Sequence, residues 1–113
     1  MKIWIAAALA SATLSCGLVS TAYAQSGIAS VYAYRGEKTA NGEFASPGKL
    51  TAAHKTLPLG TRVKVTNKRN GKSVVVRIND RGPYVHGRII DLTPAGAQAL
   101  GFNGLAQVDV KPL

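Results

Sequence analysis

Carboxylates are scarce in this 113-residue chain, which has five acidic residues against 14 lysines and arginines. Asp80 is the most informative of them, because it ends a run of strand-forming residues, 74–79, and precedes the turn-forming Arg81-Gly82-Pro83. A carboxylate at the end of a rigid strand keeps a fixed direction, which acid–base catalysis requires. The alternative is a β-turn in which Asp80 accepts backbone N–H groups and pairs with Arg81.

Two further polar clusters could work with that carboxylate. Glu43 follows Asn41-Gly42, a dipeptide typical of tight turns, and His54 ends the short segment 51–54. Glu43 can equally be an exposed turn residue, and a histidine after small residues can equally be a buried structural group. The residues alone leave a catalytic and a structural role open for each.

The same inventory excludes several kinds of chemistry. A metal site needs three or four converging ligands, whereas the chain has two histidines and a single cysteine, Cys16, near its N-terminus. Neither a G-x-S-x-G nucleophile motif nor a glycine-rich phosphate-binding loop occurs. We therefore expect no metal and no cofactor.

The first 24 residues have the composition of a secretory signal peptide. Lys2 precedes an apolar run, residues 3–14, and residues 22–24 (AYA) fit a small-x-small cleavage site. The run is short and diluted by serine and threonine, so we expect no stable membrane insertion after cleavage. The residues before Cys16 fit a lipoprotein site poorly, so lipidation is not expected. The predicted product, residues 25–113, is one exported domain, periplasmic or extracellular.

Positive charge dominates the predicted mature domain. Without Lys2, 13 basic and five acidic residues remain, a net charge of +8. An exported basic domain is suited to anionic surfaces such as cell-wall polymers or lipid headgroups, although the charge can also serve solubility alone. Aromatic residues do not alternate with the basic ones as single-strand binders require, so nucleic acid is not an expected partner.

Short strands separated by turns account for most of the pattern. Strands are expected over residues 27–34, 51–54, 61–66, 72–78 and 106–111. Asn70-Gly71 predicts a hairpin between two of them. Thr93, Pro94 and Gly101 predict the N-cap, the first residue and the stop of a short helix. We therefore expect an all-β domain with one short helix, folded as a compact β-barrel.

Taken together, these segments resemble the RlpA-like (rare lipoprotein A) family. The matching segments are TANGE (39–43), LTAAHKTLPLGTRVKVTN (50–67) and NGKSVVVRINDRGPYVHGRIIDL (70–92). The resemblance implies a six-stranded double-psi β-barrel with a substrate groove across one face. It also implies endolytic lytic transglycosylase activity on the MurNAc–GlcNAc strands of peptidoglycan, preferably strands stripped of peptides, with 1,6-anhydro-MurNAc ends as products.

In this family three motif residues carry function, and the resemblance places those roles on Asp80, Glu43 and His54. In a lytic transglycosylase the C6 hydroxyl of the muramic acid attacks C1, so one group protonates the leaving oxygen and another removes the hydroxyl proton. Asp80 is expected to be the main acid–base and must then be partly desolvated rather than tightly paired with Arg81. Glu43 would assist proton transfer or stabilise positive charge, and His54 would hydrogen-bond a carboxylate or a sugar.

Substrate contacts are expected from residues next to these three in the sequence. The candidates are Asn41, Lys55, Thr56 and Tyr84. Arg81 would either anchor its turn or bind the lactyl carboxylate of the sugar.

Two other functions stay open at this stage. One is a non-catalytic wall-binding or wall-loosening module similar to expansins, which would use the same groove and the basic surface. The other is an inhibitor or host-interaction protein on the same barrel. Val31-Tyr32-Ala33 stands where many relatives have Trp-Tyr-Gly, and the loss of that tryptophan fits an enzyme or a binding module. We expect a monomer whose partner is the peptidoglycan glycan.

Overall fold

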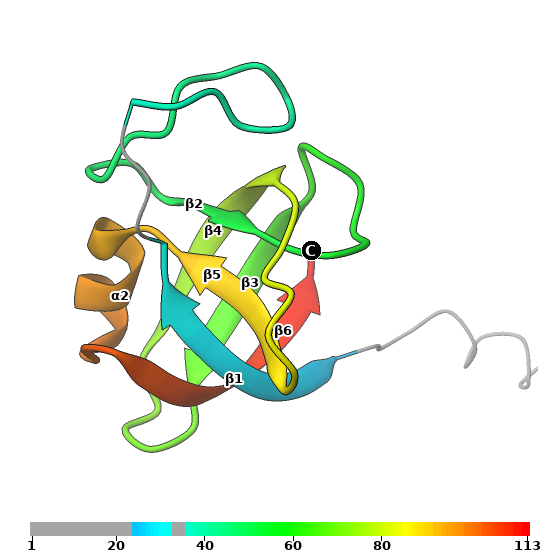
Figure 1. Cartoon of the computed structure of the whole chain (residues 1–113). Coiled ribbons are helices and arrows are strands. Elements are labelled where there is room, and N and C mark those ends of the chain that lie inside the picture. The colour runs from blue at the N-terminus through cyan, green and yellow to red at the C-terminus, as the bar shows by residue number, and fades with distance from the viewer. Residues whose placement is uncertain (1–23, 33–35) are drawn as a thin grey trace, which may run out of the picture.

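In the part of the chain that the structure describes, six strands close into a barrel and one short helix lies against it (Figure 1). The computed structural model describes residues 24–32 and 36–113. The predicted signal peptide, apart from Ala24, lies outside these residues, as does Cys16. The elements are β1 (Gln25–Val31), β2 (Thr51–Ala53), β3 (Arg62–Asn67), β4 (Ser73–Asp80), β5 (Arg88–Leu92), α2 (Pro94–Leu100) and β6 (Leu105–Pro112). Within the described ranges no helix has the length and apolarity needed to span a membrane.

The strands follow the order β1-β5-β2-β4-β3-β6 around the barrel, and pairing of β6 with β1 closes it. Strands β1 and β5 run parallel, as do β2 and β4, whereas the other neighbours are antiparallel. Each parallel pair has a register shift, between Ile28 and Ala29 and between Ala52 and Ala53. Such irregularities bend strands, as closure of a small barrel requires. The predicted all-β barrel with one short helix is confirmed.

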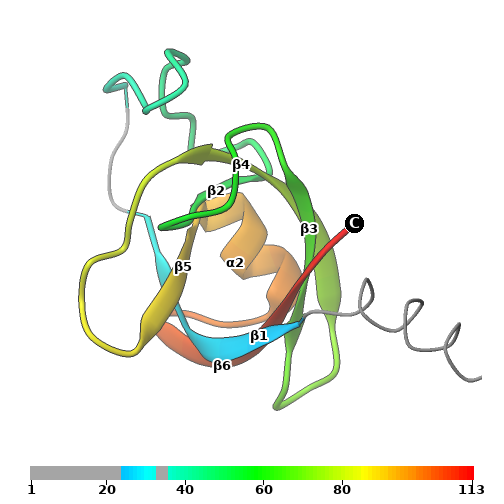
Figure 2. The same ribbon diagram turned by 90° about the vertical axis from the view of Figure 1, so that its right-hand side faces the viewer.

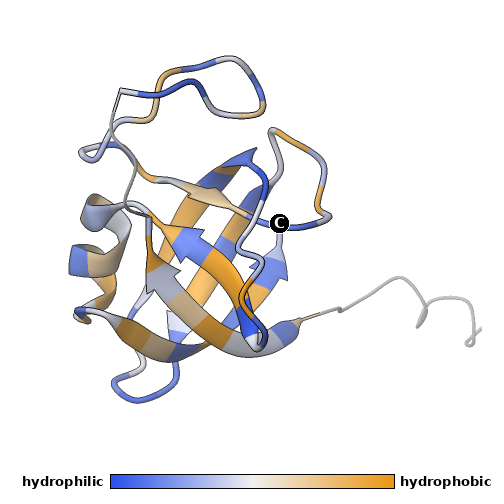
Figure 3. Ribbon diagram, in the orientation of Figure 1, coloured by the Kyte–Doolittle hydropathy of each residue, from blue (hydrophilic) through white to orange (hydrophobic). Residues whose placement is uncertain are grey.

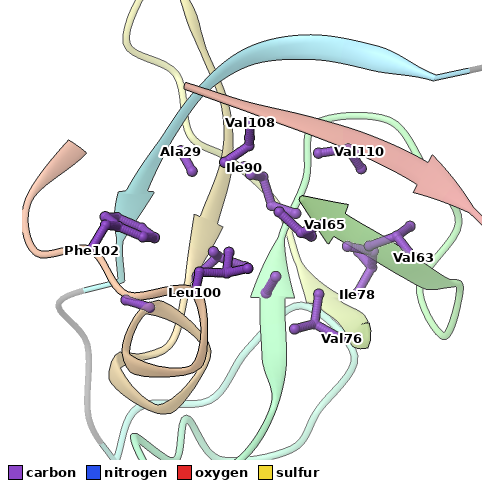
Figure 4. Packing of buried hydrophobic residues seen from close by; sticks show 13 residues of the cluster. Ala29, Val63, Val65, Val76, Ile78, Ile90, Leu100, Phe102, Val108 and Val110 are labelled. Atoms are coloured by element: carbon purple, nitrogen blue, oxygen red, sulfur yellow. The ribbon is translucent and has the colours of Figure 1, made fainter. Parts of the chain in front are cut away.

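Hydrophobic and hydrophilic residues alternate along the strands (Figure 3), and the buried ones are aliphatic. On β3, Val63 and Val65 are fully buried, whereas Arg62 and Lys64 are exposed. All six strands and α2 contribute to one core, and Figure 4 shows these side chains pointing toward one another. A slip of one residue would turn a strand's apolar set outward, so the pattern fixes the register. The register in turn fixes which polar residues stand at the strand ends.

Helix α2 begins and ends where its capping residues predict. The Thr93 hydroxyl accepts a hydrogen bond from the Gly96 N–H, Pro94 is the first helical residue, and Gly101 has the positive φ of 75° that glycine adopts without strain. The helix covers one end of the barrel (Figure 2). Its buried Leu100 joins the core there.

The β3–β4 hairpin is present, but its turn is longer than the two-residue turn that Asn70-Gly71 suggests. Strand β3 ends at Asn67 and β4 begins at Ser73. The side-chain amides of Asn67 and Asn70 both donate to the Leu100 carbonyl, at 2.9 and 3.0 Å. The longer turn thus brings two donors to the C-terminal end of α2, where helix carbonyls lack partners.

Two connections position the polar residues of interest. Residues 36–50 form a long loop that lies over the ends of β2 and β4 (Figure 1). Residues 54–61 lead from β2 to β3 along the barrel end that lies opposite α2. The predicted sequence motifs fall mainly on these two loops and on the segment after β4.

Candidate active site

Asp80 is the last residue of β4, and its carboxylate accepts three hydrogen bonds. The Tyr32 hydroxyl donates to Oδ2, and the backbone N–H groups of Ala40 and Arg81 donate to Oδ1, each at 2.9 Å. Asp80 is half-buried, and no lysine or arginine of the described residues forms an ion pair with it. Asp80 is thus a fixed, partly exposed carboxylate that no cation of the described residues neutralises.

The side chain of Arg81 points away from this carboxylate. Its Nη1 donates to the carbonyl oxygens of His54 and Leu57, at 3.0 and 2.7 Å. The guanidinium thus anchors the loop between β2 and β3. Of the two roles considered for Arg81, anchoring is the one that these contacts fit.

Glu43 has a different environment, because a guanidinium faces it. Arg77 donates Nη1 to Oε1 and Nη2 to Oε2, at 2.8 and 3.1 Å, and Asn79 donates Nδ2 to Oε1 at 2.9 Å. These bonds, first that of Arg77, lower the pKa of Glu43 from 4.5 to about 2. Glu43 is therefore a carboxylate at neutral pH with its charge compensated, and this geometry does not suit it to donate a proton.

A tight turn over residues 39–43 brings Glu43 and Asp80 to the same end of β4. The Asn41 side-chain oxygen accepts bonds from the Thr39 hydroxyl at 2.7 Å and the Glu43 N–H at 3.0 Å. The Asn41 N–H donates to the Asn79 carbonyl at 3.2 Å. Asn41, predicted as a sugar contact, thus uses its side-chain oxygen to shape the turn.

His54 is buried and faces another part of the molecule. Its Nδ1 accepts the backbone N–H groups of Thr56 and Leu57, both at 3.1 Å, and its Nε2 lies 2.9 Å from Oε1 of Gln25. Two donors facing Nδ1 require this nitrogen to be unprotonated, so Nε2 carries the proton and its N–H donates a hydrogen bond to Oε1 of Gln25.

The His54 ring is consequently neutral. Burial, and next the nearby cations Arg81 and Lys55, lower its pKa below 6.5. None of the hydrogen bonds of the ring reaches the carboxylates of Asp80 or Glu43. Its contacts tie the loop after β2 to the start of β1.

A hollow of about 280 Å³ lies beside His54. Its walls are Ala24, Gln25, His54, Thr56, Leu57, Val110 and Pro112. The predicted sugar contacts Lys55 and Thr56 are exposed on this loop, whereas Tyr84 lies in the segment after β4 and is 76% exposed. Asn41 and Glu43 thus lie at the strand end that carries Asp80, whereas Lys55 and Thr56 lie on the loop that begins at His54.

Three residues of the site escape prediction from sequence. Tyr32 holds the Asp80 carboxylate, and Arg77 and Asn79 hold Glu43. Arg77 and Asn79 lie on the same strand as Asp80. This closeness in sequence is the only feature that could have marked them as site residues. Among the described residues no cluster of three or more metal-binding side chains occurs.

Comparisons with known proteins bear on the family and on the fold. A family model described as "Lytic transglycolase" matches residues 24–111. A Synechocystis sp. protein named probable endolytic peptidoglycan transglycosylase RlpA is 62% identical over 79 residues, covering 68% of this chain and 25% of that protein. The endolytic peptidoglycan transglycosylase RlpA of Pasteurella multocida is 54% identical over 87 residues, covering 75% and 30%. The chain thus spans about a quarter to a third of the length of these relatives.

A solved structure supports the fold. The Streptomyces papain inhibitor superposes with a TM-score of 0.65, covering 83% of this chain and 97% of that one at 21% identity. A likeness at this identity bears on the fold alone. Together with the closed mixed barrel, it confirms the predicted double-psi β-barrel.

Proposed function

Because this chain belongs to the lytic transglycolase family, as its resemblance to RlpA-like proteins predicted, we propose that it is a peptidoglycan lytic transglycosylase. It cleaves the bond between MurNAc and GlcNAc in glycan strands and leaves 1,6-anhydro-MurNAc ends. Two of its relatives are named endolytic peptidoglycan transglycosylases, one of them as probable, and its own residues supply a chemical reason for such an activity.

The observation that carries the proposal is the contrast between Asp80 and Glu43. Hydrolysis of a glycosidic bond usually takes two carboxyl groups, one as acid and the other as base or nucleophile. Here Arg77 neutralises Glu43, which leaves Asp80 as the available acid–base at this end of β4. Attack by the sugar's own C6 hydroxyl needs no activated water, so a single acid–base group is sufficient.

Asp80 acts twice in the proposed reaction. In its acid form it gives a proton to the glycosidic oxygen as the bond from C1 to that oxygen breaks. The C6 oxygen then bonds to C1, and the Asp80 carboxylate removes the C6 hydroxyl proton, which restores the acid. The Tyr32 hydroxyl and the Ala40 N–H hold the carboxylate in one direction throughout. Glu43 fixes the loop that supplies this N–H.

We also propose where the enzyme acts, how it cuts the glycan and which residues contact the sugars. The enzyme acts outside the cytoplasm, as a monomer, after removal of residues 1–24. It cuts within strands and prefers strands stripped of peptides. Tyr84, Lys55 and Thr56 contact the sugars, and their exposure supports this role.

The test is mass spectrometry of soluble products from intact and amidase-treated peptidoglycan. Asp80→Asn is compared with Asp109→Asn, which removes a carboxylate from β6. Wild type and Asp109→Asn should release anhydro-ended glycans, more from amidase-treated wall, and Asp80→Asn should lose about 100-fold or more of the activity. Wall binding by the wild type without any product would contradict the proposal and support an expansin-like binding module.

A further inference from the structure

His54 and Asp80 are joined through the backbone at the ends of two neighbouring strands (Figure 1). Strands β2 and β4 run parallel, and Ala53 stands opposite Asp80 in their register. His54 comes next in the chain, and its backbone N–H donates to the Asp80 carbonyl at 3.1 Å. The imidazole is thus attached to the strand end that carries the carboxylate, although none of its own hydrogen bonds reaches that carboxylate.

Arg81 connects the Asp80 carboxylate to the loop over residues 54–61. Its backbone N–H donates to Oδ1 of Asp80 at 2.9 Å. Its guanidinium Nη1 donates to the carbonyl oxygens of His54 and Leu57, at 3.0 and 2.7 Å. Both carbonyls must face the same nitrogen for this anchor to form. The position of the Arg81 N–H on the carboxylate therefore depends on the conformation of the loop.

The His54 ring sets that conformation. Nδ1 accepts the backbone N–H groups of Thr56 and Leu57, both at 3.1 Å, which folds the chain back directly after β2. On the other side of the ring, the Nε2–H donates to Oε1 of Gln25 on β1. A proton on Nδ1 would face two N–H donors, so both bonds of the loop would be lost together. The Leu57 carbonyl would then no longer be held in front of the Arg81 guanidinium.

The surroundings of the ring keep it in the accepting form. Arg81 lies near it from the segment after β4 and Lys55 from its own loop, whereas β1 contributes the uncharged Gln25 and β6 contributes apolar residues to the adjacent hollow. Burial, and next the two cations, lower the pKa of His54 below 6.5. Among the described residues no carboxylate forms an ion pair with the ring. The neutral imidazole is therefore stable at neutral pH, and acid converts it to a donor.

We propose that His54 is a positioning residue, which fixes the Asp80 carboxylate through Arg81 and releases it when the ring takes up a proton. The Nδ1 acceptor carries this role, and the ring transfers no proton to or from the substrate. The inference rests on the proposed function, since it takes Asp80 as the acid–base. It adds an acid limit to the reaction. The proposed cleavage starts from the acid form of Asp80, which low pH favours, so a loss of kcat as the pH falls has to come from another group.

Two substitutions separate the two nitrogens of the ring. His54→Asn places its side-chain oxygen where Nδ1 stands and keeps an acceptor for the loop, but this amide takes up no proton. His54→Gln reaches the Nε2 position instead and leaves the N–H groups of Thr56 and Leu57 without that acceptor. His86→Gln is the control, because His86 is the other histidine of the chain and is exposed in the segment after β4. Circular dichroism melting checks that all variants fold.

The kinetic test measures kcat and KM for release of anhydro-ended glycans by the full-length protein between about pH 4 and 8, where Glu43 stays ionised. At neutral pH His54→Gln should lose about tenfold or more in kcat with little change in KM, because a small displacement of the reacting group slows the chemistry strongly. His54→Asn should restore most of this loss. As the pH falls below 6.5, kcat should drop in the wild type and in His86→Gln but not in His54→Asn. Equal losses in the two His54 variants, or the same acid limit in His54→Asn as in the wild type, would overturn the proposal.

Hydrogen exchange of the Arg81 N–H, followed by NMR, gives a readout that needs no activity. Its protection should be lower in His54→Gln than in the wild type, and it should fall with the protonation of His54 in the wild type but not in His54→Asn. A wild type that releases no glycan would contradict the proposed function alone, and the exchange data would still decide the positioning role. Protection of the Arg81 N–H that is independent of the state of His54 would overturn the inference, whatever the activity.

Discussion

Replacement of Glu43 by glutamine tests how the candidate site is held together. The change keeps the shape of the side chain but removes the charge that Arg77 binds through two hydrogen bonds. Lowering the pKa from 4.5 to about 2 corresponds to about 3.4 kcal/mol if it is transferred fully to folding. The Glu43 side chain is 33% exposed, however, and water screens the pair, so we expect a loss of about 1–2 kcal/mol.

The loss should depend on pH in a defined direction. The pKa of Glu43 is lower in the folded protein, so its stabilisation is full above pH 4.5 and disappears as the pH falls toward 2. Glu43→Gln should therefore lower the free energy of unfolding at pH 6, with a drop in Tm of about 5–15 °C, and most of this difference should be gone at about pH 3.

Urea unfolding at pH 6, 4 and 3 measures this difference. Glu37→Gln is the matched control, because Glu37 is an exposed acid of the same loop. A double-mutant cycle with Arg77→Gln should give a coupling energy of about 1–2 kcal/mol at pH 6. An effect of Glu43→Gln that is no larger than that of Glu37→Gln, or that is unchanged at pH 3, would refute the reasoning.

Three further changes probe other contacts. Tyr32→Phe removes the hydroxyl that donates a hydrogen bond to Asp80, so kcat for glycan cleavage should fall about tenfold or more with little change in KM. An unchanged kcat would show that catalysis does not need this hydrogen bond. The pKa of His54 is below 6.5 in the folded protein. As the pH falls, the imidazole of the unfolded chain is therefore protonated before that of the folded chain, and the wild type should lose stability below pH 6.5. Urea unfolding of His54→Gln at pH 7.5 and 5.5 should show less of this pH dependence, and an equal dependence would contradict the neutral ring. Asn70→Ala removes a donor to the Leu100 carbonyl and should lower Tm by about 4–8 °C, whereas an unchanged Tm would show that this bond contributes nothing.

Much of the barrel could be predicted because local signals agreed with the fold. Alternation of Val63 and Val65 with charged residues marked β3, and the capping residues Thr93 and Gly101 marked α2. Strand β5, Arg88–Leu92, was missed, because its two central isoleucines interrupt the alternation of apolar and polar residues. In a small closed barrel, tertiary contacts decide such a segment.

The candidate site was predictable in part. Asp80 and Glu43, both singled out by their motifs, lie at the same end of β4, because the turn before Glu43 docks on the end of that strand. The direction of the His54 side chain was not predictable, since it depends on Gln25, a residue 29 positions earlier in the sequence. The hydroxyl of Tyr32 reaches Asp80 over 48 positions, and only the closed barrel brings them together.

The most direct test of the central claim is to follow the reaction in water labelled with heavy oxygen. A transglycosylase closes the 1,6-anhydro ring with the sugar's own oxygen, so the new MurNAc ends should carry no label and be lighter by one water than hydrolysed ends. Mass spectrometry of the first soluble products should show unlabelled anhydro ends from the wild type and none from Asp80→Asn. Labelled reducing ends from the wild type would contradict the account, because they require an activated water and a second free carboxylate that the Arg77–Glu43 pair does not provide.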